Sequence, residues 1–253
     1  MSKTKHWINF CGVSSESIAG LLINELPPIQ MPPKRINKIE IEGRDGDIIE
    51  ELGYMSYDRP VQLSIIGDCD IDKVFGWLNN SGNIIFSNEP NKVYKATVCD
   101  TVAFERLVRF KKASVKFHTQ PFKTLYNELL RFVADDGTDM ANLVIKNQGN
   151  IYSRPTIEVD LGSTTWLDMK INGEATRIII EEDGNHTVVL NLENGKITVL
   201  NSQNVEVEPF SLRYPDGGIP FFKPGDNTLS LVHPAGHETD IRGVTIANVS
   251  RWL

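Results

Sequence analysis

Residues 187–200, TVVLNLENGKITVL, indicate the fold class of the chain. Two runs rich in apolar and β-branched residues, 187–192 and 196–200, flank Glu193-Asn194-Gly195. Asn-Gly supplies the positive φ angles that a tight hairpin turn requires, so we predict two antiparallel strands here. A second Asn-Gly, Asn172-Gly173, predicts another hairpin immediately upstream.

Apolar and polar residues alternate in several other stretches, which indicates strands with one buried face. The clearest are residues 61–65, 115–118 and 157–161. Turn residues such as Pro224-Gly225 divide the second half into short segments. We therefore predict that the second half is an all-β sandwich.

Two segments have helical spacing instead. Ile71, Val74, Phe75 and Leu78 follow the i, i+3, i+4, i+7 pattern, and Asp70 is a suitable N-cap. A second apolar repeat covers residues 122–133 behind Pro121 and predicts another helix. The chain is thus expected to be all-β with a small helical content.

Length and charge favour two domains. The chain has 253 residues, 26 of them basic and 33 acidic, for a net charge of −7. Residues 148–253 hold 8 basic and 14 acidic side chains, so most of the excess lies there. A polar stretch at 134–139 precedes this change, and we predict domains of residues 1–135 and 136–253. The acidic balance argues against nucleic acid as the main ligand.

The cysteines and the amino terminus indicate a protein made in the cytoplasm. Cys11, Cys69 and Cys99 are odd in number and lack CxxC spacing, so we expect buried thiols rather than disulfides or a zinc site. The apolar run at 8–13 is too short for a signal peptide, and no stretch suggests membrane insertion.

No catalytic signature is present, and we predict no catalytic residue, metal site or cofactor. His233 and His237 precede Glu238 and Asp240, but Pro234 and Gly236 exclude a helix there, so a solvated turn is favoured over a metal site. The three consecutive acids at 181–183 lack an assignable partner for glycoside hydrolysis and are typical of a turn.

Basic and aromatic residues alternate between Phe104 and Lys123. The basic members are Arg106, Arg109, Lys111, Lys112, Lys116 and Lys123, and the aromatic ones are Phe104, Phe110 and Phe117. Single-strand nucleic acid binders combine these residue types. Strand alternation places Phe117 and Lys116 on opposite faces, however, which favours a charged outer face or a subunit contact.

Residues 27–60 predict an extended hairpin arm, with the hairpin over about residues 34–60. Proline pairs open the segment, and Gly43-Arg44-Asp45-Gly46 forms a turn at the tip of the hairpin. The returning strand carries Tyr54 and Tyr57. Such a polar hairpin would pack poorly on its own domain, and reaching a neighbouring subunit would resolve this. Our subunit-interface candidates are Gly43, Arg44, Asp45, Gly46, Tyr54 and Tyr57.

The order of segments resembles the distal tail protein (Dit) family of long, flexible-tailed (siphovirus) bacteriophages. The matching segments are Phe10-Cys11-Gly12-Val13, the proline-rich stretch leading to residues 43–46, Arg59-Pro60-Val61, Trp77-Leu78, Asn147-Gln148-Gly149-Asn150, Arg154-Pro155, Pro224-Gly225-Asp226-Asn227 and Arg251-Trp252. A final Leu253 stands where the family often has a basic residue. The resemblance covers nearly the whole chain.

This resemblance implies an N-terminal ring-forming β-sandwich with a short helix and the arm, followed by a galectin-like β-sandwich. It further implies a non-enzymatic virion protein that forms a hexameric ring at the tail tip or baseplate. The ring would contact the major tail-tube protein and the tail-associated lysin or fibre protein. Whether there are one or two back-to-back rings, and whether receptor-binding proteins attach, stays open.

A carbohydrate-binding module for host cell-wall glycans is the alternative function. The candidate sugar-stacking residues of the second domain are the aromatic residues Trp166, Trp252, Tyr152, Tyr214 and Phe221-Phe222. Large aromatic residues more often fill the space between two sheets. A hydrolase is the weakest reading, because the sequence identifies no carboxylate pair.

Overall fold

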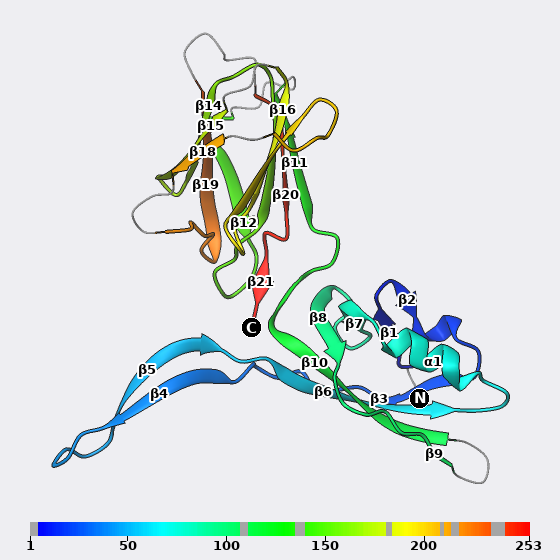
Figure 1. The fold of residues 1–253 in the computed structure, drawn as a ribbon. Helices are drawn as coiled ribbons and strands as arrows, with labels where there is room; N and C mark the ends of the chain where they lie inside the picture. Colours follow the sequence, from blue (N-terminus) through cyan, green and yellow to red (C-terminus); the bar gives the residue numbers. More distant parts are fainter. Residues whose placement is uncertain are drawn as a thin grey trace. The chain divides into compact units, whose positions relative to one another are not determined.

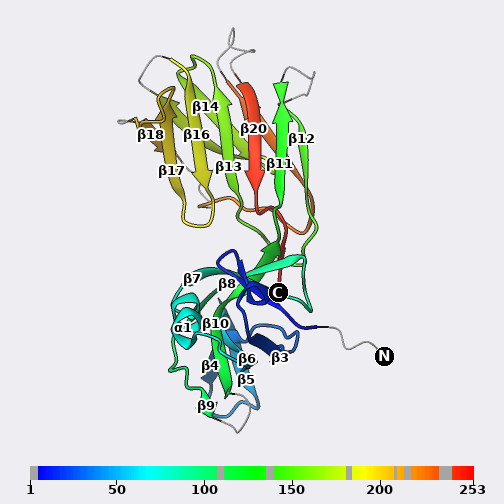
Figure 2. The same cartoon turned by 90° about the vertical axis from the view of Figure 1, so that its right-hand side faces the viewer.

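The computed structural model describes residues 5–106, 111–134, 140–180, 184–207, 210–213, 218–233 and 241–253. The chain divides into two compact units (Figures 1 and 2). The first unit comprises Met1–Tyr126 with Leu253, and the second comprises Asn127–Trp252. Both consist of antiparallel strands, and one short α-helix lies in the first unit, which confirms the predicted all-β class.

The strands of the first unit are mostly short, and one of them, β10, is much longer than the rest. They are β1 Ile8–Phe10, β2 Val13–Ser14, β3 Leu21–Glu25, β4 Lys34–Glu40, β5 Asp47–Tyr54, β6 Tyr57–Ile65, β7 Ser81–Phe86, β8 Lys92–Val98, β9 Glu105–Arg106 and β10 Lys111–Leu125. A 3-10 turn, η1, covers Ser15–Ser17. The predicted strand over residues 61–65 is part of β6, and that over 115–118 is part of β10.

One curved sheet forms the body of the first unit. Its strand order is β2-β1-β7-β8-β10-β6-β3, and β9 also pairs with β10. Strands from across this order contribute to a single buried cluster, so the sheet must curl around it. The Phe117 ring packs edge to face against Phe10, with ring centres 5.2 Å apart, and against Phe86. The predicted inward orientation of Phe117 is therefore confirmed.

The predicted helix is α1, Ile71–Leu78. The Asp70 carboxylate accepts a hydrogen bond from the amide of Asp72 at 3.0 Å, as an N-cap residue does. Val74, Trp77 and Leu78 are buried, and the indole of Trp77 donates to the carbonyl oxygen of Phe10. The amphipathic face of the helix thus closes one side of the core.

The second unit contains eleven strands in the described residues. They are β11 Leu129–Val133, β12 Leu143–Asn147, β13 Thr156–Leu161, β14 Trp166–Ile171, β15 Glu174–Ile180, β16 His186–Asn191, β17 Lys196–Asn201, β18 Phe210–Arg213, β19 Gly225–Val232, β20 Ile241–Ala247 and β21 Arg251–Trp252. Ten of them form two five-stranded sheets, with orders β11-β20-β13-β16-β17 and β12-β19-β14-β15-β18.

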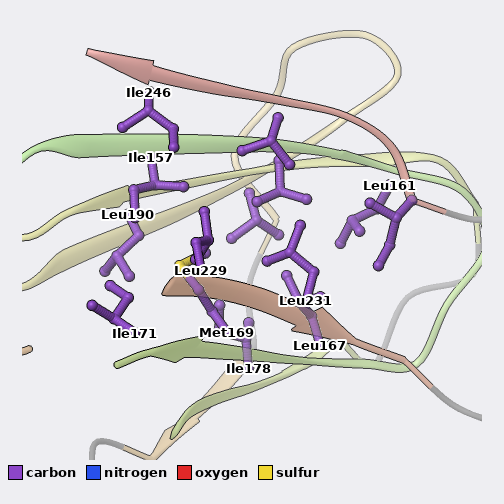
Figure 3. Packing of buried hydrophobic residues seen from close by; sticks show 14 of the residues in the cluster. Ile157, Leu161, Leu167, Met169, Ile171, Ile178, Leu190, Leu229, Leu231 and Ile246 are labelled. Carbon is purple, nitrogen blue, oxygen red and sulfur yellow. The ribbon is translucent and has the colours of Figure 1, made fainter. Parts of the chain in front are cut away.

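The two sheets face each other across one apolar core (Figure 3). Ile157, Leu190 and Ile246 reach inward from one sheet, and Met169 and Leu229 from the other. All five are fully buried, and each such side chain contributes about 1.5–3 kcal/mol by leaving water. This two-layered arrangement agrees with the predicted sandwich.

Both Asn-Gly hairpins are confirmed, with different turns. Asn172 and Gly173 have φ angles of 52° and 91°, which connect β14 to β15 by a two-residue turn. The β16–β17 turn spans four residues, and only Gly195 has positive φ there. The Asn194 side chain instead accepts a hydrogen bond from the amide of Lys196.

The predicted helix over residues 122–133 is wrong. Leu125 pairs with Lys92 at the end of β10, and Leu129 pairs with Ala247 in β11. Pro121 lies where the β10–β8 register shifts, so its missing N–H does not interrupt the ladder. The apolar spacing arises because two strands with period two are separated by a turn.

The cysteine prediction is also wrong in part. Cys11 and Cys99 are exposed, and only Cys69 packs partly against the core. Cys11 occupies a turn after β1 with a φ of 51°, and Cys99 follows the end of β8, so neither lies on an inward strand face. All three are free thiols, as expected.

Candidate functional site

Strands β4 and β5 form a separate two-stranded ribbon, hereafter the arm. Its pairs run from Lys34↔Tyr54 at the root to Glu40↔Asp47 near the tip. At the tip, Gly43 and Gly46 have φ angles of 79° and 78°, and the amide of Arg44 donates to the carbonyl oxygen of Ile41. Glycine is suited to both positions, so the predicted turn is present.

The arm leaves its apolar side chains in solvent. Every residue of β4 is exposed, and so is every residue of β5 except Tyr54. The apolar arm residues, each 37–57% exposed, are Ile36, Ile39, Ile41, Ile48, Ile49 and Leu52. Apolar side chains left exposed in this way make the arm a candidate interaction surface.

The register assigns these residues to the two faces of the ribbon. Ile39 and Ile48 are direct cross-strand partners, so they lie on one face. Ile36 and Ile49 lie on the opposite face, where Lys34 and Glu51 form an ion pair at 2.6 Å. The hydrogen bond to Glu51 raises the pKa of the exposed Lys34 ammonium.

The root of the arm is tied to the body. The Tyr54 ring packs edge to face against Phe122 of β10, with centres 5.4 Å apart. The amide of Met55 donates to the carbonyl oxygen of Pro33 at 2.8 Å. The arm therefore leaves the sheet from a fixed base.

Strand β6, which follows the arm in the chain, carries a buried cation. Arg59 is fully buried, and its guanidinium stacks on the Tyr94 ring, 4.2 Å from the ring centre, and on Phe86. Its Nη2 donates to the carbonyl oxygen of Pro28 at 3.3 Å and lies 3.7 Å from the Glu89 carboxylate. Arg59 thus joins the proline segment that precedes the arm to the interior of the sheet.

The Glu89 carboxylate balances a second buried cation. It accepts hydrogen bonds from the ammonium of Lys123, at 2.6 Å, and from the hydroxyl of Tyr94. Burial, followed by this hydrogen bond, raises the pKa of Tyr94 well above its ordinary range. Buried charges are stable only when they are paired, so this cluster serves as a structural support.

The structure separates the six interface candidates into three groups. Gly43, Arg44, Asp45 and Gly46 lie exposed at the tip. Tyr54 is half-buried against Phe122, and Tyr57 is only 8% exposed within the first unit. The exposed isoleucines of the arm were not singled out from the sequence, although their alternation with charged residues was a usable signal.

The other clusters predicted from the sequence form no metal or catalytic site among the described residues. No group of three or more metal-ligating side chains lies together within this part of the chain. Lys112 and Lys116 lie on the exposed face of β10, where Lys116 pairs with Asp100, whereas Lys123 is buried with Glu89. None of the helices described is long and apolar enough to cross a bilayer. The acids at 181–183, Arg109, Phe110, Tyr214, His237, Glu238, Asp240 and the seam at 135–139 lie outside the described residues.

Several aromatic residues of the second unit are buried or packed against other side chains of the unit. Phe222 is fully buried, and Phe221 packs edge to face on Tyr152. The Arg177 guanidinium lies 4.5 Å from the centre of the Trp166 ring, held by two 2.6 Å hydrogen bonds to Asp168. This hydrogen bonding raises the pKa of Arg177.

Comparisons with known proteins agree with this architecture. Residues 18–119, which include the arm and Arg59, match the family described as phage tail protein RIFT-related domain. The Dit protein of phage SPP1, described as a paradigm of hub adsorption apparatus in phages that infect Gram-positive bacteria, has a similar structure. It is 18% identical, with a TM-score of 0.72 over 99% of this chain and 100% of that chain.

Two phage p2 baseplate structures, in the activated conformation with Sr and with Ca, are also similar. Each is 8% identical over 96% of both chains, with TM-scores of 0.52 and 0.51. A search of the curated proteins finds no match. The predicted resemblance to distal tail proteins is thereby confirmed: residues 18–119 match the phage tail protein RIFT-related domain, and the chain as a whole shares the fold of the SPP1 Dit protein.

Proposed function

We propose that this protein is a structural distal tail protein whose copies associate through the arm into a hexameric ring. The ring would be a hub at the virion tail tip, joining the tail tube to the lysin or fibre protein. The exposed isoleucines of β4 and β5 carry this proposal. The phage tail family match and the likeness to a hub protein support it.

The arm requires a partner on physical grounds. A two-stranded ribbon is marginally stable alone in water, and this one covers little of its apolar surface within its own body. Packing Ile39 and Ile48 against a neighbour would remove apolar surface from water, which would stabilise the contact by about 25 cal/mol for each Å² buried. Both are side chains on one face, so a single complementary surface would cover them.

A ring follows from the geometry of such a contact. The arm of one copy would contact the body of the next, so the two surfaces would differ. Heterologous contacts of this kind close into rings when the rotation between copies permits. Six copies, one or two such rings, and contacts with the tail tube, lysin or fibre and receptor-binding proteins are all part of this proposal.

Light scattering coupled to size-exclusion chromatography tests the association. The wild-type chain should elute with one mass that is a multiple of 28.4 kDa. The double variant Ile39→Glu/Ile48→Glu should elute as a monomer with both units folded. Val144→Glu, which changes an even more exposed apolar residue of the second unit, is the control and should keep the wild-type mass.

A wild-type monomer at every concentration tested, or an unchanged mass in the double variant, would contradict the arm-mediated ring. Binding of the wild-type chain to isolated cell-wall glycans would instead favour the carbohydrate-binding alternative. That alternative has less support, because Phe222 is buried and Arg177 covers Trp166.

A further inference from the structure

The arm contains a β-bulge near its root. Arg35 pairs with Gly53 and Ile36 pairs with Glu51, so Leu52 is an extra residue in β5. A bulge of this kind bends its strand and increases the local twist. In Figure 1 both strands of the arm curve. The bulge lies between the fixed base at Tyr54 and the apolar residues nearer the tip.

Two residues stabilise the bulge. Gly53 has a φ of 117°, a conformation that residues with a Cβ atom rarely adopt. A Cβ at this position would meet nothing within 4 Å, so the backbone conformation rather than space favours glycine. The Arg35 guanidinium donates to the carbonyl oxygen of Leu52 at 3.0 Å, which gives the displaced carbonyl a partner.

We propose that the bulge formed by Leu52, Gly53 and Arg35 sets the angle at which the arm leaves the body, and thereby determines ring closure. This inference rests on the proposed function. Ring size depends on the rotation between adjacent copies. Because the contact residues lie farther along the arm than the bulge, a change in the bend of the arm would change this rotation. Arg35, Leu52 and Gly53 are therefore positioning residues.

Deleting Leu52 removes the bulge together with one apolar side chain of the arm, and it keeps all the exposed isoleucines. The pairs Arg35↔Gly53 and Ile36↔Glu51 then become consecutive, so every pair and both faces of the arm are kept. Ile39→Glu/Ile48→Glu is the complementary variant, because it changes the contact surface and leaves the bulge intact. Gly53→Val, which places a β-branched residue at positive φ, is a second test of the bulge.

Pulsed electron paramagnetic resonance measures the bend directly. Spin labels are placed at Asp45→Cys, at the tip, and Ser114→Cys, on β10, in full-length protein whose native cysteines are replaced by serine. The sample is diluted with unlabelled protein so that only distances within one copy contribute. The wild-type bulge should give one narrow distance distribution, and the Leu52 deletion should shift its mean to longer distance. An unchanged distribution would overturn the inference.

Mass photometry then tests whether the ring closes, because it measures the masses of the assemblies in solution. The Leu52 deletion should still associate but lose the single wild-type mass in favour of several masses, whereas Ile39→Glu/Ile48→Glu should be monomeric. A Leu52 deletion with the wild-type mass would overturn the inference while leaving the proposed function intact. A monomeric wild-type chain would overturn both the proposed ring and the closure role of the bulge, and the distance measurement would still decide whether the bulge sets the bend.

Discussion

Arg59 donates a hydrogen bond from Nη2 to the carbonyl oxygen of Pro28, 31 positions earlier in the chain. The side-chain amide of Asn88 donates to the carbonyl oxygen of the adjacent Pro27 at 3.0 Å. Two side chains of the body therefore fix the proline segment from which β4 departs. Proline also restricts φ at both positions, so the start of this segment is held in place.

Replacing Arg59 should destabilise the first unit. Arg59→Met removes the guanidinium from Tyr94, Glu89 and Pro28, but Glu89 keeps its ion pair with Lys123, so we expect a cost of about 1–3 kcal/mol. Urea unfolding followed by hydrogen exchange and mass spectrometry can report on β6 and β10 separately from the second unit. Arg44→Met at the exposed tip is the control and should change stability by less than about 0.5 kcal/mol. Equal effects of the two substitutions would show that the buried cluster is not a support.

Tyr94 should make the first unit sensitive to alkaline pH. Its folded pKa is raised by burial and by the hydrogen bond to Glu89, so the neutral phenol is favoured in the folded state. The corresponding stabilisation is complete below the unfolded pKa of about 10 and is lost as pH rises beyond it. In Tyr94→Phe the melting temperature should fall less steeply above about pH 10. Parallel curves for the two proteins would contradict the assignment.

Two glycines should respond oppositely to substitution by alanine. A Cβ on Gly149 would lie 1.7 Å from the carbonyl oxygen of Arg251, so Gly149→Ala must displace backbone and should cost about 1–3 kcal/mol. Gly76, inside α1, has open space around it, and Gly76→Ala should stabilise the first unit by about 0.5–1 kcal/mol. Thermal unfolding by calorimetry measures both. Destabilisation by Gly76→Ala would show that its environment is misassigned.

Local patterns predicted several of the elements correctly. Asp70 and the apolar spacing behind it were enough to predict α1, because an N-cap and one amphipathic turn are local properties. Asn172-Gly173 predicted its hairpin for the same reason. The false helix over 122–133 shows the limit: apolar spacing cannot distinguish one helix from two strands when the turn between them carries no Gly or Pro.

The site was predicted less completely, because its determinants are not local. The turn Gly43-Arg44-Asp45-Gly46 located the arm tip, but Tyr57 is buried although it was expected at the interface. Alternation along a strand predicts which residues share a face, but it does not determine at which residue the strand begins to be buried in the core. The role of Arg59 depends on Pro28, Glu89 and Tyr94, which meet only in the folded sheet.

Site-specific photo-cross-linking tests most directly whether the arm joins copies. A benzophenone amino acid replaces Ile48 in the full-length chain, and the irradiated protein is digested and analysed by mass spectrometry with one population isotopically labelled. The same group at Val144 in the second unit is the control. We predict that Ile48 cross-links to a peptide from a different copy of the chain, in mixed-isotope pairs. Cross-links confined to peptides of the same copy would contradict the account.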